Sequence, residues 1–331
     1  MRKYRKLLIL ALLLAVLGVG ALLLFTRTQR PPDAARLLPP GDRLIYVNFK
    51  PVHFLDLTKS RPVELEGDYR DFVQQTGIQF ERDLDEVAIS RRDTPDGTDV
   101  ESSEVFVGRF DHERLKTYLQ KASTATDAYA GQTIFSIPNE GHVVRVCILD
   151  NAKVAVTNMS SPEAIHGMID RLGKSASGSE LLESYYRNIP LTSVAWLIDR
   201  IPAGSNAPQL PGGLNFSFLE NTVTVASLRY TGDVLFQADV IAPTEADAKN
   251  VMDSAKTFLA VYRTVSRTVR PKGTDADVKA AIDSIQVNQK GNVAVFSATL
   301  SQRFLKKLVE VQPDGLTAVP SPAAGAAGRQ R

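Results

Sequence analysis

The stretch VTVASLRYTGDVLFQADVI, residues 223–241, is the strongest indication of the fold class of this chain. Apolar and polar side chains alternate in its two arms, 223–230 and 234–241, and alternation with a period of two predicts β-strands. The tripeptide Thr231-Gly232-Asp233 joins the arms, and a short connection containing glycine is typical of a β-hairpin. The two strands are therefore expected to pair antiparallel, because a parallel pair needs a crossover of a dozen or more residues.

The same pattern recurs along the chain. Two further hairpins are predicted, from 143–149 with 154–157 and from 285–287 with 293–295. Side chains that cap helices follow the strands, at Asp111, Ser161 and Thr244. Hairpins that alternate with capped helices favour antiparallel sheets covered by helices on one face, which is an α+β architecture, here in two similar halves.

Residues 7–25, LLILALLLAVLGVGALLLF, contain no charged side chain. A helix of this length rises ~28 Å, close to the hydrocarbon thickness of a bilayer, so we predict a single-pass transmembrane signal anchor whose partner is the lipid bilayer. Four basic side chains precede it, namely Arg2, Lys3, Arg5 and Lys6. By the positive-inside rule they hold the N-terminus in the cytoplasm, so the ectodomain is expected on the periplasmic side of the inner membrane. A cleaved signal peptide is the alternative.

Composition then divides the chain into six segments. They are a cytoplasmic tail at 1–6, the anchor at 7–25, a polar tether at 26–36, a first α+β domain at 37–189, a second at 190–311, and a disordered tail rich in Ala, Pro and Gly at 312–331. The boundary between the two domains is expected at Arg187-Asn188-Ile189-Pro190.

The charge argues against a nucleic-acid-binding protein, and the cysteine content excludes a protein stabilised by internal disulfides. Residues 1–36 contain seven Lys or Arg and one Asp, so the remainder has 32 basic and 36 acidic residues and a formal charge of −4. A mildly acidic ectodomain argues against nucleic acid as a partner, because that binding depends on neutralising phosphates. Cys147 is the one cysteine, so an intramolecular disulfide is excluded, and a buried structural thiol is expected.

Motifs that carry catalysis or metal binding are not recognisable. Gly173-Lys174-Ser175 resembles the end of a phosphate-binding loop, but it closes a predicted helix instead of joining a strand to a helix, so a helix C-cap is favoured. The acidic residues Asp83, Asp85 and Glu86 are interpreted as polar positions before a strand. The four histidines are scattered and lack metal-ligand spacing. No cofactor and no catalytic residue is therefore predicted.

One surface is a candidate for binding a partner. Four basic side chains fall on one face of the long helix expected after Thr244, at Lys256, Arg263, Arg267 and Arg270. They lie opposite the apolar stripe of that helix, and such a face either meets an acidic partner or anionic lipid headgroups, or is simply solvated.

Several short segments, taken in their order along the chain, also resemble those of a known group of proteins. Leu37-Leu38-Pro39-Pro40-Gly41-Asp42 leads into a predicted strand, Gly77-Ile78 precedes 82–87, and Val105–Asp111 and Tyr129-Ala130-Gly131 follow. Together with the anchor, this order resembles membrane-anchored bacterial envelope proteins of unknown function. The resemblance implies an envelope location and provides no active site.

The sequence thus predicts a non-enzymatic, membrane-anchored, extracytoplasmic binding or assembly module. Its partner would be a protein or another envelope component, or a second copy of the chain. Two alternatives stay open, an envelope hydrolase with a dispersed active site and an accessory subunit of a transport or secretion complex.

Overall fold

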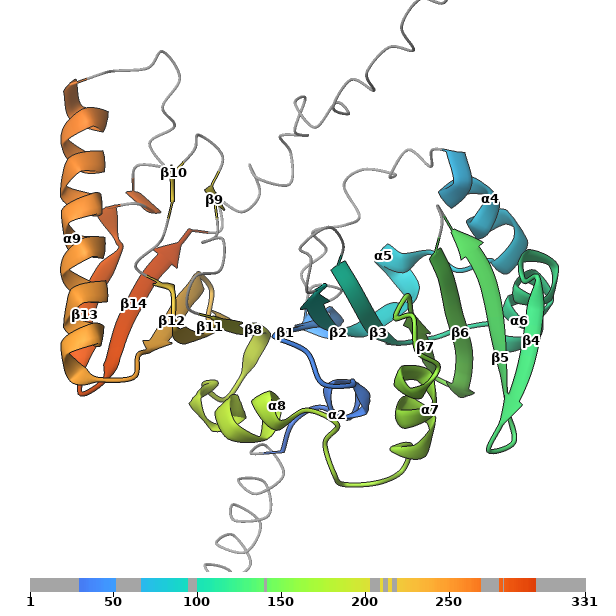
Figure 1. Cartoon of the computed structure of the whole chain (residues 1–331). Helices are drawn as coiled ribbons and strands as arrows, with labels where there is room; N and C mark the ends of the chain where they lie inside the picture. The colour runs from blue at the N-terminus through green and yellow to red at the C-terminus, as the bar shows by residue number, and fades with distance from the viewer. Residues whose placement is uncertain are drawn as a thin grey trace, which may run out of the picture.

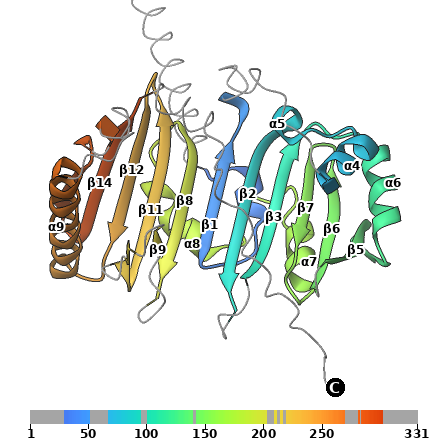
Figure 2. The ribbon, with the colours of Figure 1, turned by 90° about the horizontal axis from the view of Figure 1, so that it is seen from above.

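The structure is a computed structural model, and it describes residues 30–51, 67–94, 100–139, 142–202, 209–210, 214–215, 219–268, 280–281 and 283–301. Twelve strands form one antiparallel sheet (Figures 1 and 2). In sheet order they are β13 (Gln286–Lys290), β14 (Val293–Leu300), β12 (Val234–Ile241), β11 (Thr222–Tyr230), β8 (Ser193–Ile201), β1 (Arg43–Asn48), β2 (Leu84–Asp93), β3 (Val100–Gly108), β7 (Lys153–Thr157), β6 (His142–Asp150), β5 (Gln132–Asn139) and β4 (Ala125–Tyr129). The short strands β9 (Gln209–Leu210) and β10 (Leu214–Asn215) pair separately.

Helices lie against both faces of the sheet (Figure 1). One face carries α2 (Asp33–Leu37), α7 (Glu163–Asp170), α8 (Glu180–Tyr185) and the 3-10 turn η1 (Tyr186–Asn188). The other carries α4 (Gly67–Thr76), α5 (Phe80–Asp83) and α6 (His112–Ala122) at one end and α9 (Glu245–Thr268) at the opposite end. The prediction of helices on one face is therefore wrong, although the α+β class and the antiparallel pairing are confirmed.

The physical reason is visible in β6. Val146 belongs to the apolar core under α6, whereas the next residue, Cys147, belongs to the core on the α2 and α7 face. Successive side chains of a strand point to opposite faces, so a run of apolar residues must be covered twice. The segment 143–149 is such a run. A segment in which apolar and polar residues strictly alternate would instead have predicted a single covered face.

Each predicted hairpin is present. β11 pairs with β12 around Gly232, β6 with β7, and β13 with β14. The caps are also confirmed, since the Asp111 side chain accepts a hydrogen bond from Arg114 N and the Thr244 hydroxyl accepts one from Asp247 N. The Ser161 hydroxyl accepts a hydrogen bond from Glu163 N at the start of α7.

The sheet runs without a break through the predicted boundary near residue 189. β1 belongs to the predicted first domain, yet it pairs with β2 on one side and with β8 of the second domain on the other. Its side chains Leu44 and Tyr46 are buried, and Tyr46 stacks on Trp196 of β8 with ring centroids 5.4 Å apart. The division into two similar domains stays a prediction.

The folded body begins before the predicted boundary at residue 37. α2 starts at Asp33, and Ala34 and Ala35 are fully buried in the core beside Leu38, because this short helix seals the sheet near β2 and β3. The anchor at 7–25, the end of the long helix at Pro271 and Gly273, the helix expected around 304–309 and the tail at 312–331 lie outside the described residues. Within the described residues, none of the helices has both the length and the apolar character needed to cross a bilayer.

Candidate functional site

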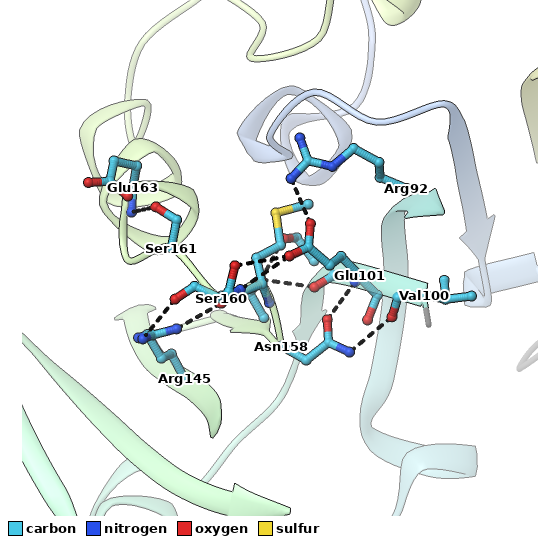
Figure 3. Close-up of polar contacts among 12 residues, drawn as sticks. Arg92, Val100, Glu101, Arg145, Asn158, Ser160, Ser161 and Glu163 are labelled. Carbon is cyan, nitrogen blue, oxygen red and sulfur yellow. Dashed lines mark hydrogen bonds and ion pairs between the residues drawn. The ribbon is translucent and has the colours of Figure 1, made fainter. Parts of the chain in front are cut away.

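The first cluster of interest is a polar network at the loop between β7 and α7 (Figure 3). Glu101 of β3 accepts hydrogen bonds from Ser160 N and Ser160 Oγ, at 3.3 and 3.2 Å, and forms an ion pair of 2.6 Å with Arg92 of β2. Arg145 of β6 donates to the carbonyl oxygens of Met159 and Ser160, at 2.7 and 3.3 Å.

This network is structural, because its members satisfy one another. Asn158 accepts from Ser102 N and donates to Val100 O, so it holds the loop to β3 (Figure 3). The hydrogen bond from Arg92 holds the pKa of Glu101 below its usual range, and a carboxylate of that kind is a poor general base. Ser160 therefore lacks the adjacent base that an activated serine needs.

The second cluster surrounds a cavity of about 410 Å³ on the α2 and α7 face of the sheet. We call it the α2 cavity. Its wall comes from three separate segments, which are the start of α2 with the residues before it, the β6–β7 turn, and the chain that leaves α7. A volume of this size is within the range of small-ligand sites in proteins.

Cationic side chains dominate the lining of the α2 cavity. They are Arg30, Arg36, Lys153, Arg171 and Lys174, against the two carboxylates Asp33 and Asp150. Both carboxylates are already paired, Asp33 with Arg36 and Asp150 with Lys153, the latter at 2.7 Å. Burial alone would raise the pKa of Asp150, but the hydrogen bond from Lys153 and the one from Ala152 N outweigh it, so the pKa lies below its usual range. Three formal positive charges are left over.

Arg171 is the most unusual of these cations. Its Nε and Nη2 donate to Leu37 O, at 3.0 and 2.7 Å, and no ion pair to a carboxylate is found for it among the described residues. Burial lowers the pKa of its guanidinium from the ordinary arginine value, with Asp170 opposing that effect. Gly178 makes the arrangement feasible, since a Cβ there would lie 2.4 Å from Arg171 Cζ and 2.3 Å from Leu38 O.

Arg36 organises the opposite wall of the α2 cavity. Its Nη1 donates to the carbonyl oxygens of Lys174 and Ser175, at 3.2 and 3.0 Å. Its Nε is buried and has no hydrogen-bond partner among the described residues. The two carbonyl oxygens of these lining residues are thus occupied by a donor.

The structure places part of the predicted basic face of α9. Lys256 is exposed, and its Nζ lies 3.3 Å from Met252 Sδ. Arg263 is half-buried and donates to Ile285 O at 3.0 Å, so it fastens α9 to the chain before β13. The side chain of Arg267 and the whole of Arg270 lie outside what the structure describes. Whether this face binds a partner stays a prediction.

The other sequence candidates have structural roles where they are described. Gly173 has φ +74 and follows the last turn of α7, as expected for a C-cap glycine. Asp83 is buried and accepts hydrogen bonds from Arg82 and from Gln79 N. Cys147 is fully buried. Within the described ranges, His, Cys, Asp and Glu side chains do not gather in threes as a metal site would require.

Sequence reasoning missed the α2 cavity. Its cations come from 30–36, from the β6–β7 turn and from 171–174, and a linear motif cannot contain residues so far apart. The tripeptide Gly173-Lys174-Ser175 was the one signal in the sequence, and it was assigned to a helix end, which is also correct.

Comparisons with known proteins give a weak structural likeness. No family model and no curated protein matches the sequence. Crystal form IV of TP0453, a protein of Treponema pallidum, superposes with a TM-score of 0.45 at 13% identity over 85% of this chain and 98% of that chain. Crystal form III gives 0.44 at 14% identity, over 84% and 98%, and form I gives 0.43 at 15%, over 84% and 97%. These values say nothing about ligand or activity.

Proposed function

We propose that this chain is a membrane-anchored, extracytoplasmic binding or assembly module of the bacterial envelope, without a catalytic role. The observation that carries the proposal is the α2 cavity, a polar hollow whose cations outnumber its carboxylates and whose wall begins at Arg30. Arg30 follows the predicted anchor by five residues. A binding site so close to the span suits a protein that acts at the membrane surface.

The polar clusters support binding over chemistry. The network around Glu101 consists of a carboxylate held ionised by Arg92 and of side chains that donate to backbone carbonyls. The α2 cavity has cations and no carboxylate that lacks a partner. Neither arrangement supplies the pair of nucleophile and base that hydrolysis by a dispersed site needs.

The exposed face of α9 is the proposed protein-binding surface. The test is chemical crosslinking in intact membranes, followed by recovery of the tagged full chain and identification of the attached proteins. We expect Lys256→Glu with Arg267→Glu to remove the attached protein, whereas the control Lys116→Glu with Lys121→Glu on α6, which makes the same charge change, keeps it.

Arg263 is left unchanged in this design because it holds α9 to the chain before β13. Recovery of the same attached protein from both variants would contradict the proposal that the α9 surface binds a protein. The extracytoplasmic location would be contradicted if protease digests the ectodomain only after the cytoplasm is opened.

A further inference from the structure

We propose that the α2 cavity binds a phosphate group, taken either from a lipid headgroup of the membrane that anchors the chain or from free phosphate. This inference rests on the proposed function as a binding module and names the ligand class of its cavity. It does not depend on the α9 surface.

The first argument is the balance of charge. The chain from residue 37 onwards has more acidic than basic residues, with 36 against 32. The α2 cavity departs from this balance, since it brings five cations together with two carboxylates that are already paired. Like charges gathered around a hollow repel one another, and a bound anion would relieve that repulsion.

The second argument is the state of Arg171. A half-buried guanidinium such as that of Arg171 is favoured by a carboxylate or phosphate partner, because taking part of its charge out of water is costly. Arg171 has hydrogen bonds to one carbonyl oxygen, Leu37 O, through Nε and Nη2. Its Nη1 makes no hydrogen bond to the described residues and is available to an incoming acceptor.

The third argument distinguishes phosphate from a simple carboxylate. Three positive charges remain after internal pairing, and a single carboxylate would neutralise one of them. Free phosphate carries up to two negative charges and a headgroup phosphodiester carries one, and both offer more acceptor oxygens than a carboxylate, which suits guanidinium forks and ammonium groups placed around them. Arg36 also takes up the carbonyl oxygens of Lys174 and Ser175, which would otherwise repel an anion.

The fourth argument concerns the source of the phosphate. Phe25 ends the predicted span and Arg30 is five residues further on, so the wall of the α2 cavity begins within ~18 Å of the hydrocarbon edge. Lipid headgroups extend beyond that edge by ~5–8 Å on each side. A headgroup phosphate is therefore within reach, and free phosphate is the other source of the same chemistry.

The experiment uses the full chain in a neutral detergent and isothermal titration calorimetry with two probes. One probe is inorganic phosphate, and the other is a short-chain phosphatidylglycerol below its micelle concentration. The test variant is Arg30→Glu with Lys174→Glu, because both side chains are exposed and their loss leaves the Arg171 and Arg36 hydrogen bonds in place. The control is Lys116→Glu with Lys121→Glu.

We expect saturable binding of at least one probe, weakened about tenfold or more in the test variant and unchanged in the control. Binding of the lipid probe alone would assign the headgroup as the source, and binding of both would assign free phosphate as a sufficient ligand. Absence of binding by the unaltered chain, or equal weakening in the control, would overturn the proposal. That result would leave the crosslinking test of the α9 surface unaffected, so the two failures are distinguishable.

Discussion

Gly178 packs against Arg171 of the α2 cavity, and its replacement by alanine is a direct test of how that arginine is held. A Cβ at this position would lie 2.3 Å from Leu38 O, 2.4 Å from Arg171 Cζ and 2.6 Å from Arg171 Nε. The Leu38 oxygen belongs to the backbone beside α2, and the guanidinium is fixed by its hydrogen bonds to Leu37 O. Neither neighbour is the free end of a flexible side chain, so one of them must be displaced.

The expected cost follows from these two neighbours. Insertion of a methyl group into a well-packed site costs ~1–3 kcal/mol, and loss of hydrogen bonds made by a charged group costs ~1.5–3 kcal/mol. The two effects overlap, because displacement of Arg171 relieves part of the clash. We therefore expect Gly178→Ala to lower the free energy of unfolding by about 2–4 kcal/mol.

The assay is urea unfolding of the full chain in a neutral detergent, followed by the fluorescence of Trp196. This residue is the single tryptophan and is buried against Tyr46 in the same core as Leu38, so its signal reports on the relevant part of the molecule. Gly173→Ala is the matched control, since a Cβ there meets no atom within 4 Å and only the positive φ is strained.

The control should cost about 1 kcal/mol, from backbone conformation alone. A double-mutant cycle with Arg171→Ala should return a coupling of about 1 kcal/mol or more, because removal of the guanidinium makes room for the new methyl group. A change of less than ~0.5 kcal/mol for Gly178→Ala would refute the close packing of Arg171 on which the cavity depends.

Three further outcomes are expected. Burial raises the pKa of the Cys147 thiol to about 12, so the folded chain should react with iodoacetamide at pH ~8 at least tenfold more slowly than the unfolded chain, and equal rates would contradict its burial. Burial also raises the pKa of Glu104, so ionisation of this side chain destabilises the fold as pH rises. In urea unfolding, Glu104→Gln should increase the free energy of unfolding at pH ~7 but not below pH ~4. Burial opposes but does not overcome the hydrogen bonds from Arg82 and Gln79 N, so the pKa of Asp83 is lowered and the stabilisation that its carboxylate contributes is lost as pH falls. Asp83→Asn should therefore lower the free energy of unfolding at pH ~7 and do so progressively less toward pH ~2. A cost that is independent of pH would contradict this assignment.

The features that the sequence predicted correctly depend on residues close together in the chain. The hairpin around Gly232 and the caps at Asp111 and Thr244 involve partners a few residues apart, so turn chemistry and side-chain type suffice. Local pattern also gave the α+β class, through hairpins that alternate with helices.

The features that it missed depend on residues far apart. The second covered face is built by α4–α6 and α9, and the pattern of 143–149 does not indicate which helices cover it. The α2 cavity joins Arg36 to Ser175 across 139 residues, and Arg171 to Leu37 across 134. Pairings of this kind are set by the order of strands in the sheet, and no spacing in the sequence encodes them.

The position of β1 fixes one wall of the α2 cavity to the sheet. As an edge strand, β1 would be free to fray, and α2 would move with the predicted tether. β1 instead lies at the centre of the sheet between β2 and β8, and Leu44 and Tyr46 are buried in the core that also contains Ala34 and Leu38. The segment from Asp33 to Asn48 is therefore held at both its helix and its strand, so Arg36 keeps its place in the wall of the α2 cavity. Such rigidity lets charged groups meet a ligand without reorganisation.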